Sequence, residues 1–131
     1  MNKLMLIAIL SSLIFIAGCT QNTKEPILKP DAQSQNVIEI TASGFTPAKL
    51  TISSGETVTF VNKDSESHWP ASAMHPTHAL YPESGGCISS KFDACKGLSE
   101  GETFSFVFNN KGNWPYHDHL IPSLRGSIEV I

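Results

Sequence analysis

The sequence has 131 residues, 40% of them hydrophobic, and a net charge of −3 from 9 Lys and Arg against 12 Asp and Glu. This length suits one domain, and the ordinary apolar content with low charge excludes an intrinsically disordered chain. The small negative charge excludes recognition of DNA or RNA through a basic face, so we expect no nucleic-acid partner.

The first segment has the features of a secretion signal. Lys3 supplies a positive charge, and the apolar run from Leu4 to Ala17 is shorter than the ~20 residues that cross a bilayer. The run ends in Ala17-Gly18-Cys19, which resembles the lipobox of bacterial lipoproteins. The resemblance implies that residues 1–18 are a signal peptide and that Cys19 is lipidated. The alternative is an uncleaved anchor helix, and both place the rest of the chain at a membrane, outside the cytoplasm.

Residues 19–35 are polar, contain Pro26 and Pro30 and show no periodicity, which predicts a flexible lipid-anchored linker. The folded unit is then residues 36–131. A unit this small gains stability from a covalent crosslink. Cys87 and Cys95 are the two remaining cysteines of the three in the chain, and outside the cytoplasm they predict a disulfide. The alternative for this pair is a metal thiolate.

Short runs of alternating apolar and polar residues indicate β-strands throughout the domain. The runs are 37–40, 49–53, 56–62, 102–108, a strand that begins at Trp114, and 126–131. Strands of this length and spacing predict an all-β, antiparallel sandwich or barrel. Residues 64–100 form a long insertion rich in Pro, Gly and Ser, and loops of this length tend to carry function.

All five histidines lie in the insertion or shortly after it: His68, His75, His78, His117 and His119. Residues i and i+2 of a strand point to the same face, so His117 and His119 present two imidazoles side by side, with Asp118 directed the other way. Imidazole is a good ligand for copper, zinc and nickel. The clustering therefore predicts a metal site.

The framework around these histidines resembles a cupredoxin. The first half of that family is similar to residues 37–40 (VIEI), 44–47 (GFTP) and 55–64 (GETVTFVNKD), and the second half to 112–117 (GNWPYH) and 125–130 (RGSIEV). The resemblance covers residues 36–131 and implies a single Greek-key β-sandwich that binds copper outside the cytoplasm. In that family, of which plastocyanin and azurin are members, a histidine soon after the N-x-D turn is the first copper ligand. His68 holds that position here.

The chain departs from the cupredoxins at the other copper ligands. Matching the second half places Asp118 at the usual cysteine, Ile121 near the usual histidine and Leu124 at the usual methionine. A blue-copper site needs a thiolate with two imidazoles and a weak axial ligand. The resemblance therefore does not predict a blue-copper site in this chain. Residues 114–119 (WPYHDH) instead resemble the His-x-His strand of multicopper oxidases, in which both imidazoles hold copper.

Two arrangements of the metal site remain open. In the first, His68 joins Asp118 and a histidine of the insertion. In the second, the imidazoles at 117 and 119 join His75 or His78 on the opposite face of the strand. Successive side chains of a pleated strand point to opposite faces, so one metal site cannot combine the two arrangements. We favour a mixed site in which Asp118 is a ligand or orients an imidazole. The candidate metal ligands are His68, His75, His78, His117, His119 and Asp118.

These features predict a membrane-tethered, extracytoplasmic copper-binding lipoprotein, on the periplasmic or cell-surface side, for copper handling or electron transfer. Zinc is the alternative metal. The expected partners are the membrane, through Cys19, and a redox or copper-transfer protein. Two other classes remain: a metal-free cupredoxin-like interaction module, and a small copper or zinc enzyme with an open metal position. No Ser-His-Asp triad, paired acid–base carboxylates or phosphate loop is evident, so the sequence favours a binding protein over an enzyme.

Overall fold

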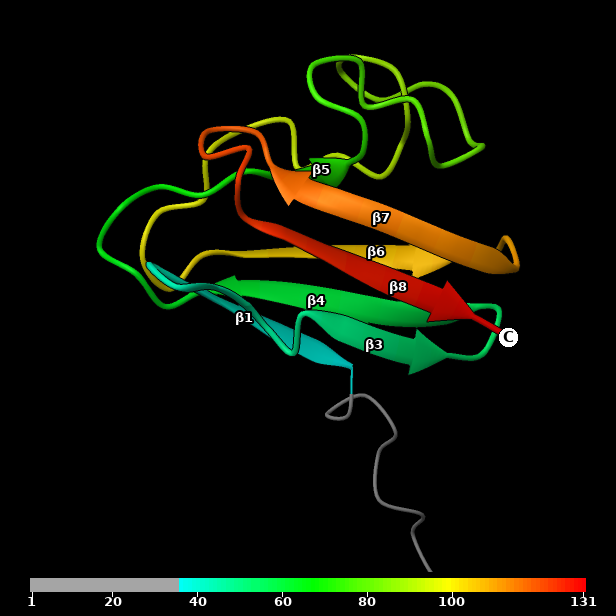
Figure 1. The fold of residues 1–131 in the computed structure, drawn as a ribbon, viewed down its shortest axis with the longest axis horizontal. Helices are drawn as coiled ribbons and strands as arrows, with labels where there is room; N and C mark the ends of the chain where they lie inside the picture. The colour runs from blue at the N-terminus through cyan, green and yellow to red at the C-terminus, as the bar shows by residue number, and fades with distance from the viewer. Residues whose placement is uncertain (1–35) are drawn as a thin grey trace, which may run out of the picture.

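A computed structural model describes residues 36–131, which form eight β-strands (Figure 1). The strands are β1 (Val37–Thr41), β2 (Gly44–Thr46), β3 (Lys49–Ile52), β4 (Glu56–Asn62), β5 (Pro70–Ser72), β6 (Thr103–Phe108), β7 (Gly112–Asp118) and β8 (Arg125–Val130). They make two four-stranded sheets, ordered β2-β1-β4-β6 and β3-β8-β7-β5. The predicted all-β sandwich is confirmed.

The predictions for the start of the chain lie outside the described residues. They are the signal peptide (1–18), the linker (19–35) and the lipidation of Cys19. Within residues 36–131, no helix has the length and apolar character needed to cross a membrane.

Each sheet contains one parallel pair in addition to its antiparallel pairs. β1 runs parallel to β4, with Ile38 opposite Phe60, and β3 runs parallel to β8, with Leu50 opposite Ile128. The chain passes from one sheet to the other between β2 and β3 and back again before β4. Because of these crossings, strands that are not consecutive in the sequence become neighbours running in the same direction.

Two strands were not predicted, and one of them supports the histidines. β2 and β5 have three residues each, too few for an alternating pattern to be recognised. β5 lies at the edge of its sheet and pairs with β7, so that Ala71 is opposite His117. It begins with Pro70, which an edge strand tolerates at its first position because one backbone N–H can be missing there.

Aromatic side chains fill the space between the sheets. Phe104, Phe106 and Phe108 of β6 lie on one face of the strand, and all three pack on the hydrophobic core or belong to it. Phe92 is fully buried and contacts this row, with its ring centroid 4.8 Å from that of Phe108 and 5.2 Å from that of Phe106. Since Phe92 belongs to the insertion, the insertion is anchored in the core.

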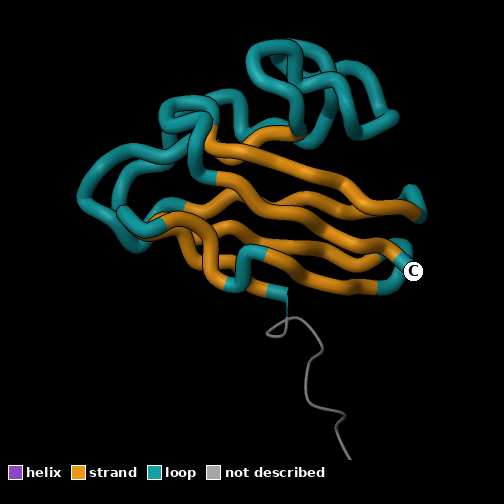
Figure 2. The backbone as a smooth tube through the Cα atoms, in the orientation of Figure 1, coloured by secondary structure: helices purple, strands orange, loops and turns teal. Residues whose placement is uncertain are grey.

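After β5, the rest of the insertion, residues 73–100, forms a long loop next to that strand (Figure 2). The backbone N–H of Ser72 donates to the carbonyl of Phe92 (2.8 Å), and that of Ala94 donates to the carbonyl of Pro70 (3.0 Å). The predicted disulfide between Cys87 and Cys95 is present in this loop. A core aromatic, two backbone contacts with β5 and a crosslink therefore fix the part of the loop that lies closest to the histidines.

Candidate metal centre

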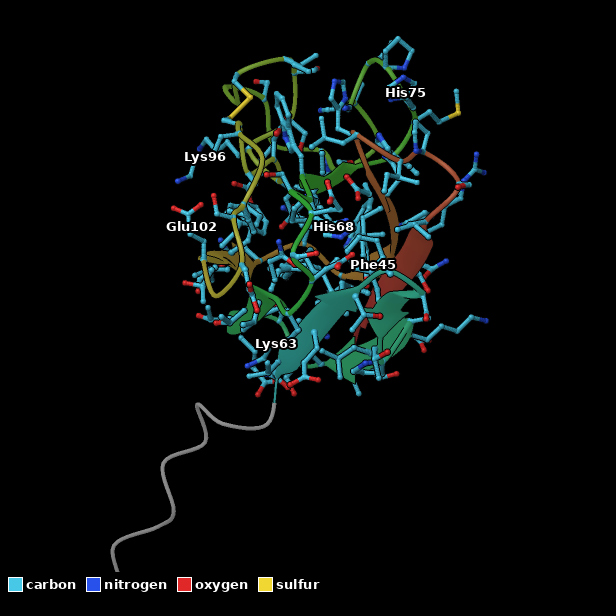
Figure 3. The ribbon with its side chains drawn as sticks, turned by 90° about the vertical axis from the view of Figure 1, so that its left-hand side faces the viewer. Phe45, Lys63, His68, His75, Lys96 and Glu102 are labelled. Carbon is cyan, nitrogen blue, oxygen red and sulfur yellow. A yellow bond between two sulfur atoms is a disulfide. The ribbon has the colours of Figure 1, made fainter. Side chains whose placement is uncertain are left out.

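Four of the five histidines come together beside β5: His75, His78, His117 and His119. Each offers one ring nitrogen to a shared space, and these four atoms lie within 4.8 Å of one another. Nε2 of His78 is 2.8 Å from Nδ1 of His119, and Nδ1 of His75 is 3.3 Å from Nε2 of His117. Figure 3 shows His75 at the outer edge of the domain. Two histidines of the insertion thus meet two from the end of β7.

The backbone on both sides of the cluster is held by hydrogen bonds. On the β7 side, His119 follows the end of the strand, and its backbone N–H donates to the carbonyl of Trp69 (2.7 Å). On the insertion side, the N–H of His78 donates to the carbonyl of Met74 (2.8 Å), which closes a turn around Pro76. This turn brings the His75 and His78 side chains to the same place.

The cluster is buried on the inside and open on one side. His78 and His117 are buried, His119 is half-buried and His75 is exposed. Desolvation by burial lowers the pKa of His117 to about 4, together with repulsion from the three other histidines. Desolvation by burial, together with repulsion from His78 and His75, lowers the pKa of His119. At neutral pH both imidazoles are therefore uncharged, which is the form that binds metal ions.

The cluster has the dimensions that one metal ion requires. Two imidazole nitrogens bound to the same ion at about 2.0–2.1 Å lie no more than about 4 Å apart. Two of the pairs here, at 2.8 and 3.3 Å, already meet this limit, and the 4.8 Å span of the group exceeds it by less than 1 Å. Small ring movements close that difference. A donor set made only of imidazoles suits copper, zinc or nickel.

The other two candidate ligands, His68 and Asp118, lie outside the cluster. Nδ1 of His68 is 2.5 Å from Oδ2 of Asp118, and Nε2 of His68 is 3.1 Å from Oδ2 of Asp64. Burial opposes the charging of His68, but the hydrogen bonds and charges of the two carboxylates outweigh it and raise the His68 pKa. Both ring nitrogens of His68 are thus occupied by carboxylates.

The structure contains parts of both predicted arrangements. The pairing of His68 with Asp118 belongs to the first, but no histidine of the insertion joins it. The gathering of His117 and His119 belongs to the second, and both His75 and His78 join them rather than one. Asp118 points away from the cluster, as strand alternation predicted, and its Oδ1 accepts from the backbone N–H groups of Trp69 (2.9 Å) and Leu120 (3.0 Å).

Two further residues contact the cluster, and the sequence marked neither of them as a candidate ligand. Oδ2 of Asp93 is 2.6 Å from Nδ1 of His78. The indole of Trp69 lies against His119, with ring centroids 4.5 Å apart. No spacing rule connects Asp93 with a histidine 15 residues earlier in a loop. The sequence of the insertion therefore did not predict the contact of Asp93 with His78 or that of Trp69 with His119.

No protein-family model matches the sequence, and no curated protein matches it. Solved structures do match the described domain. A purple cupredoxin from Nitrosopumilus maritimus has a TM-score of 0.59 and 25% identity, covering 72% of this chain and 98% of that chain. A reduced Cu(I) form of an amicyanin variant at pH 4 has a TM-score of 0.59 and 20% identity, covering 78% of this chain and 87% of that chain. Another reduced amicyanin variant has a TM-score of 0.57, also at 20% identity.

The domain is cupredoxin-like. At 20% identity, the likeness to amicyanin concerns the fold alone. The cupredoxin-like domain carries Asp118 where the family pattern has cysteine and His68 where it has the first histidine ligand. These two side chains, which would share one copper ion in a blue-copper protein, contact each other directly here. The four-histidine cluster of this cupredoxin-like domain is therefore a different donor set in a different place.

Proposed function

We propose that this protein is an extracytoplasmic copper-binding protein that holds one copper ion between His75, His78, His117 and His119 for copper handling. The observation that carries the proposal is the convergence of four imidazole nitrogens in a partly buried space. Among divalent first-row metals, copper(II) binds a nitrogen site most tightly. When bound, copper would supply a one-electron redox couple and an exchangeable metal centre. Zinc suits the same donors, but nothing in the structural relatives favours it.

The donor set supports copper handling over fast electron transfer. Cys87 and Cys95 are joined in a disulfide, so among residues 36–131 no thiolate is available to make a blue centre. His75 is exposed while His78 and His117 are buried. A ligand at the surface can be exchanged first, which gives a copper-transfer protein or a redox partner a point of approach. Ligand exchange through His75 is therefore the step that we assign to the open side of the cluster.

We assign the protein to the outer side of a membrane. The disulfide favours an oxidising compartment. The lipobox-like sequence that ends at Cys19 supports a lipid tether followed by a linker, which would keep the copper site close to the membrane. Mass spectrometry of the protein from the membrane fraction checks this tether: a chain that begins at an acylated Cys19 is expected, and an unmodified Cys19 in a chain that keeps residues 1–18 would contradict the lipid tether.

Copper loading of the purified protein tests the site. We expect one Cu(II) per chain, an EPR spectrum of nitrogen coordination and weak visible absorption without an intense thiolate band. Replacing His117 and His119 together by alanine removes two of four ligands and is expected to lower the copper affinity at least 100-fold. Thr77→Ala is the matched control, because Thr77 is exposed in the same turn as His75 and offers no imidazole.

The other outcomes of this titration are equally decisive. Tight zinc binding with weak copper binding would overturn the choice of metal. An unchanged copper affinity in the double variant would show that copper binds elsewhere. If neither metal binds with all four histidines intact, the metal-binding function is wrong and the interaction-module alternative takes its place.

A further inference from the structure

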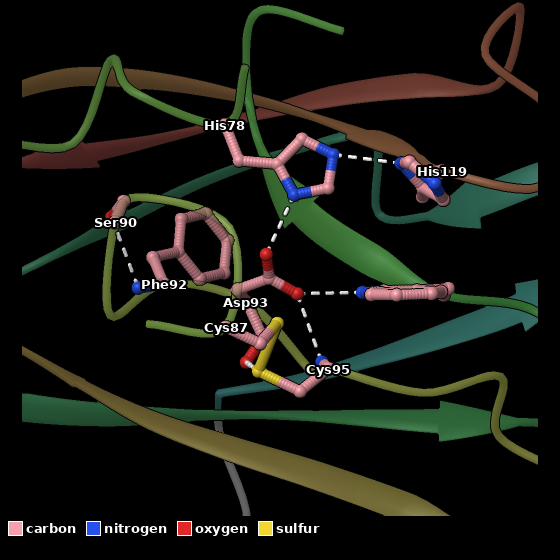
Figure 4. Close-up of a disulfide and its surroundings, with 8 residues drawn as sticks. His78, Cys87, Ser90, Phe92, Asp93, Cys95 and His119 are labelled. Atoms are coloured by element: carbon pink, nitrogen blue, oxygen red, sulfur yellow. Dashed lines mark hydrogen bonds and ion pairs between the residues drawn. A yellow bond between two sulfur atoms is a disulfide. The ribbon is translucent and has the colours of Figure 1, made fainter. Parts of the chain in front are cut away.

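Asp93 contacts His78 of the histidine cluster (Figure 4), and its carboxylate is fully buried. Its Oδ2 is 2.6 Å from Nδ1 of His78. An ionised carboxylate only accepts hydrogen bonds, so Nδ1 of His78 carries the proton of this contact. The lone pair of a neutral His78 is then on Nε2. This is the atom that lies 2.8 Å from Nδ1 of His119, inside the cluster.

The second carboxylate oxygen of Asp93 is also fully engaged. Its Oδ1 accepts from Nε1 of Trp69 (2.6 Å) and from the backbone N–H of Cys95 (2.8 Å). The Trp69 ring in turn packs on His119, at a centroid distance of 4.5 Å. Asp93 is therefore connected to two of the four histidines, to His78 by a hydrogen bond and to His119 through the indole.

The charge of Asp93 has no lysine or arginine partner in the part of the chain that the structure describes. The ion pairs of lysine there join Lys91 to Glu83 and Lys96 to Glu102, while Asp93 pairs only with His78. A buried anion is costly without a compensating positive charge. A metal ion on Nε2 of His78 would place that charge on the other side of the same imidazole ring.

We propose that Asp93 positions His78 for metal binding and makes the cluster favour copper(II) over copper(I). This inference rests on the proposed binding of copper at the four histidines. A carboxylate behind a ligating imidazole fixes its tautomer and raises its basicity. In addition, a fixed negative charge attracts a dication twice as strongly as a monocation at the same distance. Asp93 therefore strengthens Cu(II) binding more than Cu(I) binding, which lowers the reduction potential of the site.

Asp118 also contacts a histidine, but its surroundings give it no such role. Asp118 contacts His68 just as closely, through Nδ1. The other nitrogen of His68 is taken by Asp64, whereas the other nitrogen of His78 faces three more imidazoles. Of these two pairs, the one formed by Asp93 and His78 combines a buried carboxylate with an imidazole nitrogen that faces the other histidines of the cluster.

The test compares Asp93→Asn and Asp93→Glu with the wild-type protein, and uses Asp64→Asn as the control at the other carboxylate–histidine contact. We expect Asp93→Asn to lower the Cu(II) affinity 10- to 100-fold, with a smaller loss of Cu(I) affinity. Each tenfold difference between the two losses raises the reduction potential by about 59 mV. Asp93→Glu keeps the charge and is expected to restore most of the potential, while Asp64→Asn leaves the potential unchanged. Equal losses of Cu(I) and Cu(II) affinity, with no change in potential, would overturn the role in metal selection.

A second measurement needs no metal. Nitrogen-15 chemical shifts of the His78 ring in the metal-free wild-type protein are expected to show the Nδ1–H tautomer, and this fixed tautomer is expected to be lost in Asp93→Asn. Finding the Nε2–H tautomer in the wild-type protein would overturn the positioning role, even if Asp93→Asn failed to fold. If the wild-type protein bound no copper, the proposed function would fail, and with it the metal preference. The tautomer would still report separately whether Asp93 orients His78.

Discussion

His68 holds the position of the first copper ligand in the cupredoxin pattern, but it lies outside the four-histidine cluster. Its ring lies between two carboxylates, Asp118 on one side and Asp64 on the other, and its side chain is completely buried. Asp118 is held in turn by two backbone N–H groups. This chain of contacts joins the end of β4, the residues before β5 and the end of β7. His68 therefore stabilises the framework next to the histidine cluster and lies outside that cluster.

The raised pKa of His68 predicts how the stability of the metal-free protein varies with pH. Because the folded state binds this proton more tightly, the His68 contribution is fully present below its unfolded pKa of about 6.5 and is lost as pH rises through the folded pKa. His117 acts in the opposite sense, because its pKa is lowered to about 4 and the unfolded state gains its proton first as pH falls below 6.5. Stability is thus expected to peak near neutral pH.

Thermal unfolding of the metal-free protein between pH 4 and pH 9 measures this profile. His68→Gln is expected to flatten the descending limb above neutral pH, and His117→Gln the ascending limb between pH 4 and 6.5. The two variants serve as controls for each other, since each should leave the other limb in place. If the descending limb persisted in His68→Gln, the loss of stability above neutral pH would come from another titrating group.

At the scale of elements, the insertion stays in place through three kinds of contact. The disulfide closes the loop between Cys87 and Cys95, which are eight residues apart. Phe92 enters the core, and the backbone of Phe92 and Ala94 pairs with β5. Loop-closure entropy assigns a crosslink of this size about 2.5 kcal/mol. The backbone pairing and Phe92 hold Asp93 independently of the crosslink.

Replacing Cys87 and Cys95 together by serine is therefore expected to lower the free energy of unfolding by about 2.5 kcal/mol and to reduce the copper affinity less than Asp93→Asn does. Denaturant unfolding and copper titration of the same variant measure the two effects. If the double serine variant remained folded but lost copper binding, its affinity loss would exceed the one expected here. The crosslink itself would then set the position of Asp93.

The long strands could be predicted and the short ones could not, for a physical reason. In β4 and β6, apolar and polar residues alternate over seven and six residues, so the sequence indicates which side chains face the core. β5 has three residues, and all three are buried, so no alternation marks it. Phe92 lies in a stretch rich in Gly and Ser, and its place in the core depends on contacts with β6 that are remote in the sequence.

The same distinction applies to the site. The pairing of His117 with His119 follows from strand geometry, and both reach the cluster. The path of a loop is not set by local periodicity, so the sequence left open whether His75 or His78 would join them. His68 and Asp118 were candidate ligands through the cupredoxin resemblance and its ligand positions. Their direct contact spans 50 residues of sequence and became visible only in the folded chain.

For the molecule as a whole, a metal ion in the cluster would connect the insertion to the sheet. His75 and His78 come from the insertion, and His117 and His119 from the end of β7, so one ion would replace the weak contacts among four imidazoles by a shared centre. A ligand that binds only the folded state stabilises it by an amount that depends on its concentration, about 2.7 kcal/mol at 100 times the dissociation constant. The open edge that His75 occupies would then gain the restraint that Phe92 and the disulfide already give to the later part of the insertion.

We therefore expect copper to raise the melting temperature in a concentration-dependent way, and a chelator to reverse the rise. Backbone hydrogen exchange should slow most in residues 73–80, around His75 and His78, because these amides lie in the loop that the ion would restrain. It should change least in β4, which lies in the other sheet. The double variant with alanine at positions 117 and 119 is the control and should show neither effect. If copper slowed exchange in that variant to the same extent, the stabilisation would come from a different site, because the two imidazoles that bridge the insertion to β7 would be gone.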